Sequence, residues 1–410
     1  MKRKLVLVVN CGSSSLKYQL MDPKESEPLA KGLITNIGTE ISAAKQETAD
    51  GKVKEACPVP DHTAAIRWML EKLTDTTCGV IASLEEISAV GHRVLHGGAG
   101  LTRSVLVTEE VKKTIAECIP LGPLHNPANL TGIEICEKLM PGIPQAAVFD
   151  TAFHQTMPPK AYRYGIPKEY YEKYQIRRYG FHGTSHRYVS RRACEVLGIP
   201  QEGTKMIVCH LGSGSSLSAV KDGKCVDTTM GLPPLEGVLM GTRSGSLDPA
   251  VVSFLAEKLN LSAAEVVDDI LNKKSGLLGV TGKTPGMKEV IRLAEEDHDP
   301  DAILALDMMV YGVQKYIGAY TVAMGGLDAL VFTAGVGENS AYIRKRIAEG
   351  LGCVGVKLDY AKNEAVSGSE AVISASDSKV TVMVVPTNEE LMIALDTIQV
   401  TEEMTEKKPC

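Results

Sequence analysis

The sequence lacks the features that place a chain in a membrane or send it out of the cell. No segment approaches the roughly twenty consecutive apolar residues of a membrane-spanning helix. The opening MKRKLVLVV resembles a signal peptide, but its apolar run stops after five residues, whereas a secretory core needs about seven to fifteen. We therefore expect neither a membrane partner nor a secretion signal.

Closely spaced cysteine pairs are also missing. The ten cysteines are scattered from Cys11 to Cys410, and none forms a C-x-x-C pair. This pattern is typical of neither a disulfide framework nor a zinc site, and it suits a reducing compartment. The sequence thus predicts a cytoplasmic protein.

The chain has no excess of positive charge. Its formal net charge is −6 and its pI is about 5.9, with lysine and arginine spread along the sequence. A nucleic-acid partner is therefore not expected. With 410 residues, 44% of them hydrophobic, the chain is long enough for two cores, which predicts two domains.

Small polar residues interrupt two strand-like stretches in the same way. Residues 5–20 read LVLVVNCGSSSLKYQL, and residues 206–220 read MIVCHLGSGSSLSAV, with Asn10 aligned to His210. Free backbone amides, hydroxyls and Lys17 would suit an anion such as phosphate, although a plain β-hairpin turn is the alternative. Two copies in a chain of this length suggest a duplicated fold whose halves offer phosphate-binding hairpins to a shared cleft.

Strand and helix patterns alternate along the rest of the chain, which indicates an α/β protein. Strands are expected at residues 87–94 and 145–150, and a helix from Pro127 to about residue 139. Residues 327–347 predict a strand, a glycine turn and a helix.

Several residues are candidates for helix caps. Asp61 is expected to cap one helix, and Thr184 or Ser185 to cap another. Thr387 and Glu390 have the spacing of a capping box.

Polar residues lie where the predicted strands end, which is where open α/β sheets bind their ligands. A single arginine usually makes a surface salt bridge. Two of the arginines here are instead embedded among apolar residues and glycines, which favours gripping a carboxylate or phosphate with the planar guanidinium. The candidates are Asn10, Arg93, Asp150, His182, His210 and Arg243.

These stretches together closely resemble the acetate kinases, which belong to the acetate and sugar kinase, actin and heat-shock ATPase superfamily. The resemblance covers residues 4–400 and rests on NCGSSSLKYQL, GHRVLHGG, PLHNPAN, VFDTAFHQTMP, RRYGFHGTSH, HLGSGSS, PLEGVLMGTRSG, FTAGVGENS and PTNEELMIALDT. It implies two duplicated actin-like ATPase (ribonuclease H-like) domains with the active site in the cleft between them. Residues 1–149 plus 389–410 would form the N-terminal domain with a returning C-terminal helix, and 150–388 the nucleotide-binding domain.

The resemblance also implies roles for individual residues. The magnesium positions correspond to Asn10 and Glu389, and the catalytic positions to Arg93, Asp150, His182 and Arg243. The substrate methyl would lie among Leu95, Leu124, Phe181 and Pro234, beside Arg93. The nucleotide positions are Lys17, His210, Leu211, Gly212, Ser213, Gly214, Gly286, Met287, Lys288, Gly335, Val336, Gly337, Glu338 and Asn339.

The implied reaction is reversible phosphoryl transfer from ATP to acetate, with Mg²⁺ as cofactor and Mn²⁺ able to replace it, in a homodimer. Asp150 is expected to orient the metal, its waters or an arginine, because a carboxylate substrate has no proton to lose near pH 7. A propionate kinase is the close alternative. A non-catalytic ATP switch is the alternative from another class, although it would have no need of a carboxylate grip.

The chain departs from the family pattern mainly on the nucleotide side. Ser213 stands where the family usually has Asn, Gly286 where it has Asp, and Lys288 where it has Arg. Pro233 replaces a common Thr, and Ser246 a common Asp. Fewer side-chain hydrogen bonds should therefore reach the nucleoside, which predicts weak discrimination between nucleotides.

Overall fold

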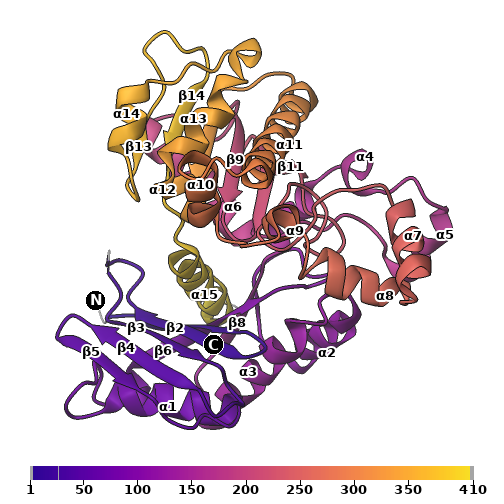
Figure 1. Ribbon diagram of the computed structural model, residues 1–410. Helices are drawn as coiled ribbons and strands as arrows, with labels where there is room; N and C mark the ends of the chain where they lie inside the picture. Colours follow the sequence, from indigo (N-terminus) through magenta and orange to yellow (C-terminus); the bar gives the residue numbers. More distant parts are fainter. Residues whose placement is uncertain (1–2, 26, 407–410) are drawn as a thin grey trace. The chain divides into compact units, whose positions relative to one another are not determined.

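The computed structural model describes residues 3–25 and 27–406, and the chain divides into two compact units (Figure 1). The first unit comprises residues 1–152 and 388–410, and the second comprises residues 153–387. Each unit is built on one sheet of mixed strand direction covered by helices. The α/β class is therefore confirmed.

The sheet of the first unit has the order β5-β4-β3-β2-β1-β6-β8-β7. β1 pairs antiparallel with β2 and parallel with β6, which in turn runs parallel to β8. The strands are β1 (Leu5–Cys11), β2 (Ser15–Met21), β3 (Ala30–Thr35), β4 (Ala43–Thr48), β5 (Gly51–Glu55), β6 (Ile87–Val94), β7 (Val105–Leu106) and β8 (Gln145–Phe149).

Helices cover both faces of this sheet, which explains the uninterrupted apolar run of β1. Val6 and Val8 pack with Ile393 of the C-terminal helix, whereas Leu7 and Val9 belong to the opposite core. The helical segments are α1 (His62–Thr74), η1 (Leu84–Glu86), α2 (Glu109–Glu117), η2 (Ile119–Leu121), α3 (Asn126–Leu139) and α15 (Glu389–Glu406).

Gly91 on β6 allows α15 to approach the sheet closely. A Cβ atom at Gly91 would lie 2.3 Å from Thr397 Oγ1 and 2.9 Å from Ile393 Cγ2. We expect Gly91→Ala to lower the free energy of unfolding by about 1–3 kcal/mol, because an added methyl overpacks this contact. Urea denaturation followed by the fluorescence of Trp68, the single tryptophan, measures it. Gly100→Ala, where the new Cβ would meet nothing within 4 Å, is the control, and equal stability of both variants would contradict the prediction.

The sheet of the second unit has the order β11-β10-β9-β12-β14-β13. In both units, two antiparallel pairings are followed by two parallel ones, so β11-β10-β9-β12-β14 repeats β3-β2-β1-β6-β8. This common topology confirms the predicted duplication. The strands are β9 (Lys205–Leu211), β10 (Ser215–Lys221), β11 (Lys224–Thr228), β12 (Ala329–Thr333), β13 (Ala371–Val372) and β14 (Thr381–Val384).

The second sheet is also covered on both faces. Ile207 and Cys209 face the core that contains α11, whereas Met206 and Val208 pack with Val189 of α6. The helical segments are η3 (Ala152–Thr156), α4 (Pro159–Tyr162), α5 (Lys168–Tyr174), α6 (Gly183–Leu197), α7 (Ala250–Leu259), α8 (Ala263–Glu265), η4 (Val266–Leu271), α9 (Gly276–Thr281), α10 (Met287–Glu295), α11 (Pro300–Met324), α12 (Ala334–Asn339), α13 (Ala341–Glu349), η5 (Gly352–Val354) and α14 (Tyr360–Ala365).

Several local predictions are confirmed. Asp61 caps α1, its Oδ1 accepting a hydrogen bond from Ala64 N at 2.8 Å. The predicted strands at 87–94 and 145–150 are β6 and β8, and Pro127 lies in the first turn of α3.

Other local predictions are wrong. Neither Thr184 nor Ser185 caps α6, which already begins at Gly183 after His182. The predicted glycine turn after β12 is the short helix α12. Thr387 and Glu390 form no capping box, because Asn388 Oδ1 accepts the hydrogen bond from Leu391 N at 3.0 Å.

Within the described ranges, no helix has the length and apolar character needed to span a bilayer. The described cysteines, from Cys11 to Cys353, are all free thiols.

Candidate active site

The first unit joins an arginine and a carboxylate at neighbouring strand ends. Arg93 lies on β6, and Asp150 directly follows β8. Arg93 Nε is 3.1 Å from Asp150 Oδ1, and Nη2 is 2.6 Å from Oδ2, so the guanidinium grips the carboxylate with both arms. Arg93 Nη1 also donates to Asn10 Oδ1 at 3.4 Å. Since β1, β6 and β8 run parallel, their carboxyl ends bring these three predicted residues together.

Charge and burial at these strand ends shift the pKa values of Arg93 and Glu389. The Asp150 side chain is only 3% exposed, and its charge raises the pKa of Arg93. Burial raises the pKa of Glu389, at the start of α15, to about 7, although the positive charge of Arg93 opposes this rise. Removing the Glu389 carboxylate from water therefore costs free energy that a nearby cation would offset.

The oxygen atoms near Arg93 suit a Mg²⁺ ion that binds only a few protein ligands. Within residues 3–25 and 27–406, no group of three or more His, Cys, Asp or Glu side chains is arranged to hold a metal ion. Mg²⁺ does not need such a cage, because it usually keeps several waters and binds one or two carboxylates together with substrate phosphates. The amide oxygen of Asn10 and the partly buried carboxyl of Glu389 match that donor chemistry.

Lys17 lies beside the first Gly/Ser turn. It pairs with Asn10 across β1 and β2, and its half-exposed side chain forms an ion pair with Glu390 of α15. The turn itself is a hairpin closed by a 2.8 Å hydrogen bond from Gly12 N to Ser15 O. The hairpin alternative describes its backbone correctly, and an anion-binding role for Lys17 stays a prediction.

In the second unit, His182 and Arg243 converge on the turn between β9 and β10. A Cβ atom on Gly214 would lie 3.4 Å from Arg243 Nη2 and 3.5 Å from His182 Nε2. Glycine at this position therefore leaves space between the turn and two donor-bearing side chains. The neighbouring Gly212 N donates to Gly214 O at 3.2 Å and shapes the turn.

His182 adopts a conformation that its local sequence does not favour. It precedes α6 with a φ of 59°, in the left-handed region that non-glycine residues seldom occupy. Its ring stacks on His210 with 4.1 Å between centroids, and its Nδ1 is 2.9 Å from Ser216 Oγ. Such backbone strain persists where surrounding contacts hold it, commonly at functional sites.

Arg243 is a half-buried cation that has no counter-ion in the part of the chain that the structure describes. Burial lowers its pKa, and no carboxylate within the described residues lies at ion-pair distance from it. Its Nη1 donates to Pro234 O at 2.7 Å, which fixes the guanidinium. A fixed, partly desolvated arginine that no carboxylate neutralises is suited to bind an anion.

Two predicted nucleotide segments lie next to each other. Gly241 N donates to Ser213 O at 3.0 Å, and a Cβ on Gly241 would lie 3.2 Å from Pro285 O. Gly241 therefore contacts both the His210–Gly214 turn and Pro285, the residue that precedes Gly286. Gly286 is the N-cap residue of α10, and both Gly286 and Lys288 are exposed.

The third predicted nucleotide segment, residues 335–339, is held by its own glutamate. Glu338 Oε1 accepts from Ala334 N at 2.7 Å and from Thr387 N at 3.0 Å. The Glu338 carboxylate thus shapes α12 and ties it to the chain before α15.

The sequence did not predict a role for Arg344, whose side chain donates hydrogen bonds to the backbone of α12. Its side chain is fully buried, and its Nη1 donates to Gly337 O at 3.0 Å and to Glu338 O at 2.9 Å. Its Nε and Nη2 reach Asn363 and Val366. Its position in the helical pattern could have indicated burial, because Arg344 lies on the buried face of α13 with Ile343 and Ile347.

The four residues predicted to surround the substrate methyl differ in exposure. Leu95 and Phe181 are buried, and the Leu95 side chain faces Gly122. Leu124, by contrast, is 59% exposed. Leu95 and Leu124 belong to the first unit, and Phe181 and Pro234 to the second.

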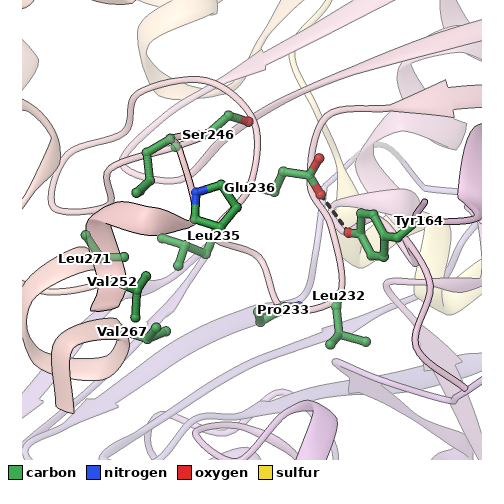
Figure 2. A pocket seen from close by; sticks show the side chains of 12 residues that line it. Tyr164, Leu232, Pro233, Leu235, Glu236, Ser246, Val252, Val267 and Leu271 are labelled. Carbon is green, nitrogen blue, oxygen red and sulfur yellow. Dashed lines mark hydrogen bonds between the residues drawn. The ribbon is translucent and has the colours of Figure 1, made fainter. Parts of the chain in front are cut away.

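The segment that carries Pro234 and Arg243 also forms one wall of an apolar pocket of about 440 Å³ (Figure 2). Pro233, Leu235 and Ser246 line this pocket, whereas Pro234 and Arg243 do not. Tyr164 Oη donates to Glu236 Oε2 at 2.7 Å at its edge. The pocket is thus separate from the convergence of side chains at Gly214.

The chain matches known proteins along almost its whole length. The model of the acetokinase family covers residues 5–395. An acetate kinase from Desulfitobacterium hafniense (strain DSM 10664 / DCB-2) is 56% identical over 397 residues, which cover 96% of this chain and 98% of the relative. An acetate kinase from Thermoanaerobacterium thermosaccharolyticum is 55% identical over 399 residues, covering 97% and 99%.

Solved structures agree with this relationship. The crystal structure of Porphyromonas gingivalis acetate kinase has a TM-score of 0.93 at 49% identity, covering 97% of this chain and all of that one. A propionate kinase from Francisella tularensis has a TM-score of 0.90 at 43% identity, with the same coverage. The chain belongs to the acetokinase family.

Proposed function

We propose that this chain catalyses the reversible transfer of a phosphoryl group from ATP to acetate, giving ADP and acetyl phosphate. Membership of the acetokinase family supports this reaction. The observation that carries the proposal is Arg243, a fixed cation that has no carboxylate partner among the described residues and converges with His182 on Gly214. That arrangement suits the oxygens of a phosphoryl group in transfer.

Phosphoryl transfer requires positioning and neutralisation of charge rather than covalent help. In the proposed reaction, Arg243 and His182 donate to the oxygens of the transferring phosphoryl group, and Arg93 binds the carboxylate of acetate. Asp150 already accepts two hydrogen bonds from Arg93, which supports an orienting role. It need not act as a base, because acetate is ionised near neutral pH.

Asn10 and Glu389 are proposed to hold Mg²⁺. When bound, the ion neutralises phosphate oxygens, and Mn²⁺, which prefers the same oxygen ligands, is expected to replace it. The proposed nucleotide contacts are Lys17, the turn from His210 to Gly214, residues 286–288 and residues 335–339.

Trapping the acyl phosphate tests the reaction. Protein, Mg-ATP and hydroxylamine are incubated with formate, acetate, propionate or butyrate, and the acyl hydroxamate is measured. We expect the largest signal with acetate. A chain that only switches conformation with ATP would give no hydroxamate with any of these acids, and that result would overturn the proposal.

Leu95 is proposed to limit the length of the acid. The resemblance implies valine at this position in acetate kinases and alanine in propionate-preferring relatives, so leucine would leave the least room. Forcing a methylene into a full pocket costs about 1–3 kcal/mol, which predicts a preference for acetate over propionate of roughly tenfold or more in kcat/KM.

Leu95→Ala should narrow or reverse this preference, as steady-state kinetics with both acids would measure. Leu101→Ala, at a partly buried packing position of the same unit, is the control. An unchanged ratio in Leu95→Ala would remove Leu95 from the acid site, and a wild type that prefers propionate would identify a propionate kinase.

Nucleotide choice should be weak. The exposed Ser213 and Gly286 replace the family's Asn and Asp, so fewer paired polar groups are available to tell bases apart. We expect ATP to be favoured over GTP by less than about 100-fold in kcat/KM, roughly 2.7 kcal/mol. Ser213→Asn should increase the preference. A wild-type ratio above this limit would show that backbone contacts supply the discrimination.

We propose that the two compact units correspond to the two domains of the duplicated fold. The resemblance implies domain boundaries at residues 149/150 and 388/389, whereas the compact units divide at 152/153 and 387/388. A homodimer is also proposed, supported by an apolar stripe on α11, where Leu304, Met308 and Tyr311 are 49%, 43% and 63% exposed. A monomer mass in sedimentation equilibrium would contradict it.

The free thiols support a cytoplasmic location, which fractionation of the source cells would test.

A further inference from the structure

One buried hydroxyl links two histidines behind the turn from His210 to Gly214. Ser216, on β10, is fully buried, and its Oγ lies 2.9 Å from His182 Nδ1 and 2.8 Å from His186 Nε2. A serine hydroxyl has a single proton. Its two lone pairs could accept from both rings, but its own proton would then be buried without an acceptor among the described residues. The hydroxyl therefore donates to one ring and accepts from the other.

His186 determines the direction of the two hydrogen bonds at Ser216 Oγ. It is fully buried on α6, and burial, together with the charges of His154 and His210, lowers its pKa well below the usual value. His186 is thus neutral and has one N–H. Its Nδ1 has no hydrogen-bond partner within the part of the chain that the structure describes.

The two possible tautomers of His186 differ in what they leave unpaired. A proton on Nδ1 would bury an N–H donor without an acceptor, whereas a proton on Nε2 donates to Ser216 and leaves only a lone pair unpaired. Buried N–H groups without partners are rare, because leaving such a donor unpaired loses its hydrogen bond to water without replacement. The Nε2–H tautomer is therefore favoured, and His186 donates to Ser216 Oγ.

The direction of the remaining bond follows. Ser216 accepts from His186, so its own proton goes to His182 Nδ1. We propose that Ser216 and His186 are positioning residues that hold His182 in its Nε2–H tautomer. This inference rests on the proposed role of His182 as a donor to the transferring phosphoryl group.

The location of His182 Nε2 explains why the tautomer matters. Both this atom and Arg243 Nη2 face Gly214, within 3.5 Å of where a Cβ would stand. With its proton on Nε2, His182 offers a donor beside the guanidinium. With the proton on Nδ1, it would offer a lone pair, which an anionic phosphoryl group repels.

The first test is a tautomer measurement on the wild-type protein. Nitrogen NMR of ¹⁵N-histidine-labelled protein, with His182→Gln used to identify the signals, should show His182 protonated at Nε2 and unprotonated at Nδ1. A proton on Nδ1 would overturn the inference. This readout does not depend on turnover, so a protein with the expected tautomer but no hydroxamate product would refute only the proposed function.

The second test removes the hydroxyl. Ser216→Ala should lower kcat by about 10- to 100-fold, leave the KM values within about twofold, and shift the proton of His182 toward Nδ1. Ser218→Ala is the matched control, because Ser218 is a fully buried serine two residues along β10 that bonds to Thr228 instead. Wild-type turnover and tautomer in Ser216→Ala, or an equal loss in Ser218→Ala, would contradict the proposal.

Discussion

Replacing Arg243 with alanine should lower kcat by about 10²- to 10³-fold while the protein stays folded. Arg243 forms no ion pair within the described residues, so its removal leaves no carboxylate unpaired. The loss should appear in turnover, because the guanidinium is proposed to stabilise charge that develops on the phosphoryl group. Steady-state kinetics, with circular dichroism as a check on folding, measure it.

Two variants sharpen this prediction. Arg243→Lys should recover only part of the activity, since lysine retains the charge but loses the planar fork. Arg191→Ala, which removes an arginine from an exposed ion pair with Glu195, should leave turnover unchanged. Near-normal kcat in a natively folded Arg243→Ala protein would exclude the proposed role.

Arg93 should behave differently under the same substitution. Alanine here removes the proposed grip on acetate, but it also leaves the buried Asp150 carboxylate without its partner. Breaking such a buried pair usually costs about 3–5 kcal/mol. Loss of activity in Arg93→Ala would therefore combine two effects, whereas Arg243→Ala isolates catalysis.

The second large effect is expected at Arg344. Arg344→Ala should lower the free energy of unfolding of its unit by about 3–5 kcal/mol, because carbonyl oxygens of Gly337, Glu338 and Asn363 lose a buried charged donor. It should also raise the KM for ATP if α12 contacts the nucleotide as proposed. Urea denaturation followed by far-ultraviolet circular dichroism measures the first effect, and steady-state kinetics the second.

The control for Arg344 lies on the same helix. Arg346 forms an ion pair with Asp307, whose side chain is 55% exposed, and such pairs contribute about 0–1 kcal/mol. Arg346→Ala should therefore be nearly as stable as the wild type. If both variants lost equal stability, the buried network around α12 would not be what stabilises this part of the fold.

The sequence predicted the features that short, repeated patterns determine. The two Gly/Ser interruptions marked equivalent hairpins, and the ends of parallel strands brought Asn10, Arg93 and Asp150 together. These arrangements follow from backbone geometry, because adjacent parallel strands end at the same edge of a sheet. Local pattern was therefore sufficient to predict a duplicated α/β fold and the placement of Asn10, Arg93 and Asp150 at neighbouring strand ends.

Features that depend on distant contacts were not predicted. Thr184 and Ser185 are good cap residues by type, but α6 begins earlier because His182 occupies a left-handed conformation, with Ser216 and His210 around its ring. Asn388, rather than Thr387, caps α15. The Thr387 hydroxyl instead donates to Ser185 Oγ at 2.8 Å, 202 positions earlier in the chain. No local spacing rule contains such contacts.

The central claim is direct, reversible transfer of a phosphoryl group between ATP and acetate. Phosphorus NMR of the reverse reaction tests it most directly, with ADP, Mg²⁺ and acetyl phosphate supplied to the protein. The account predicts that the acetyl phosphate signal declines as the γ-phosphate signal of ATP grows, and that Arg243→Ala slows both changes together. Release of inorganic phosphate without ATP, or no change in acetyl phosphate, would contradict it.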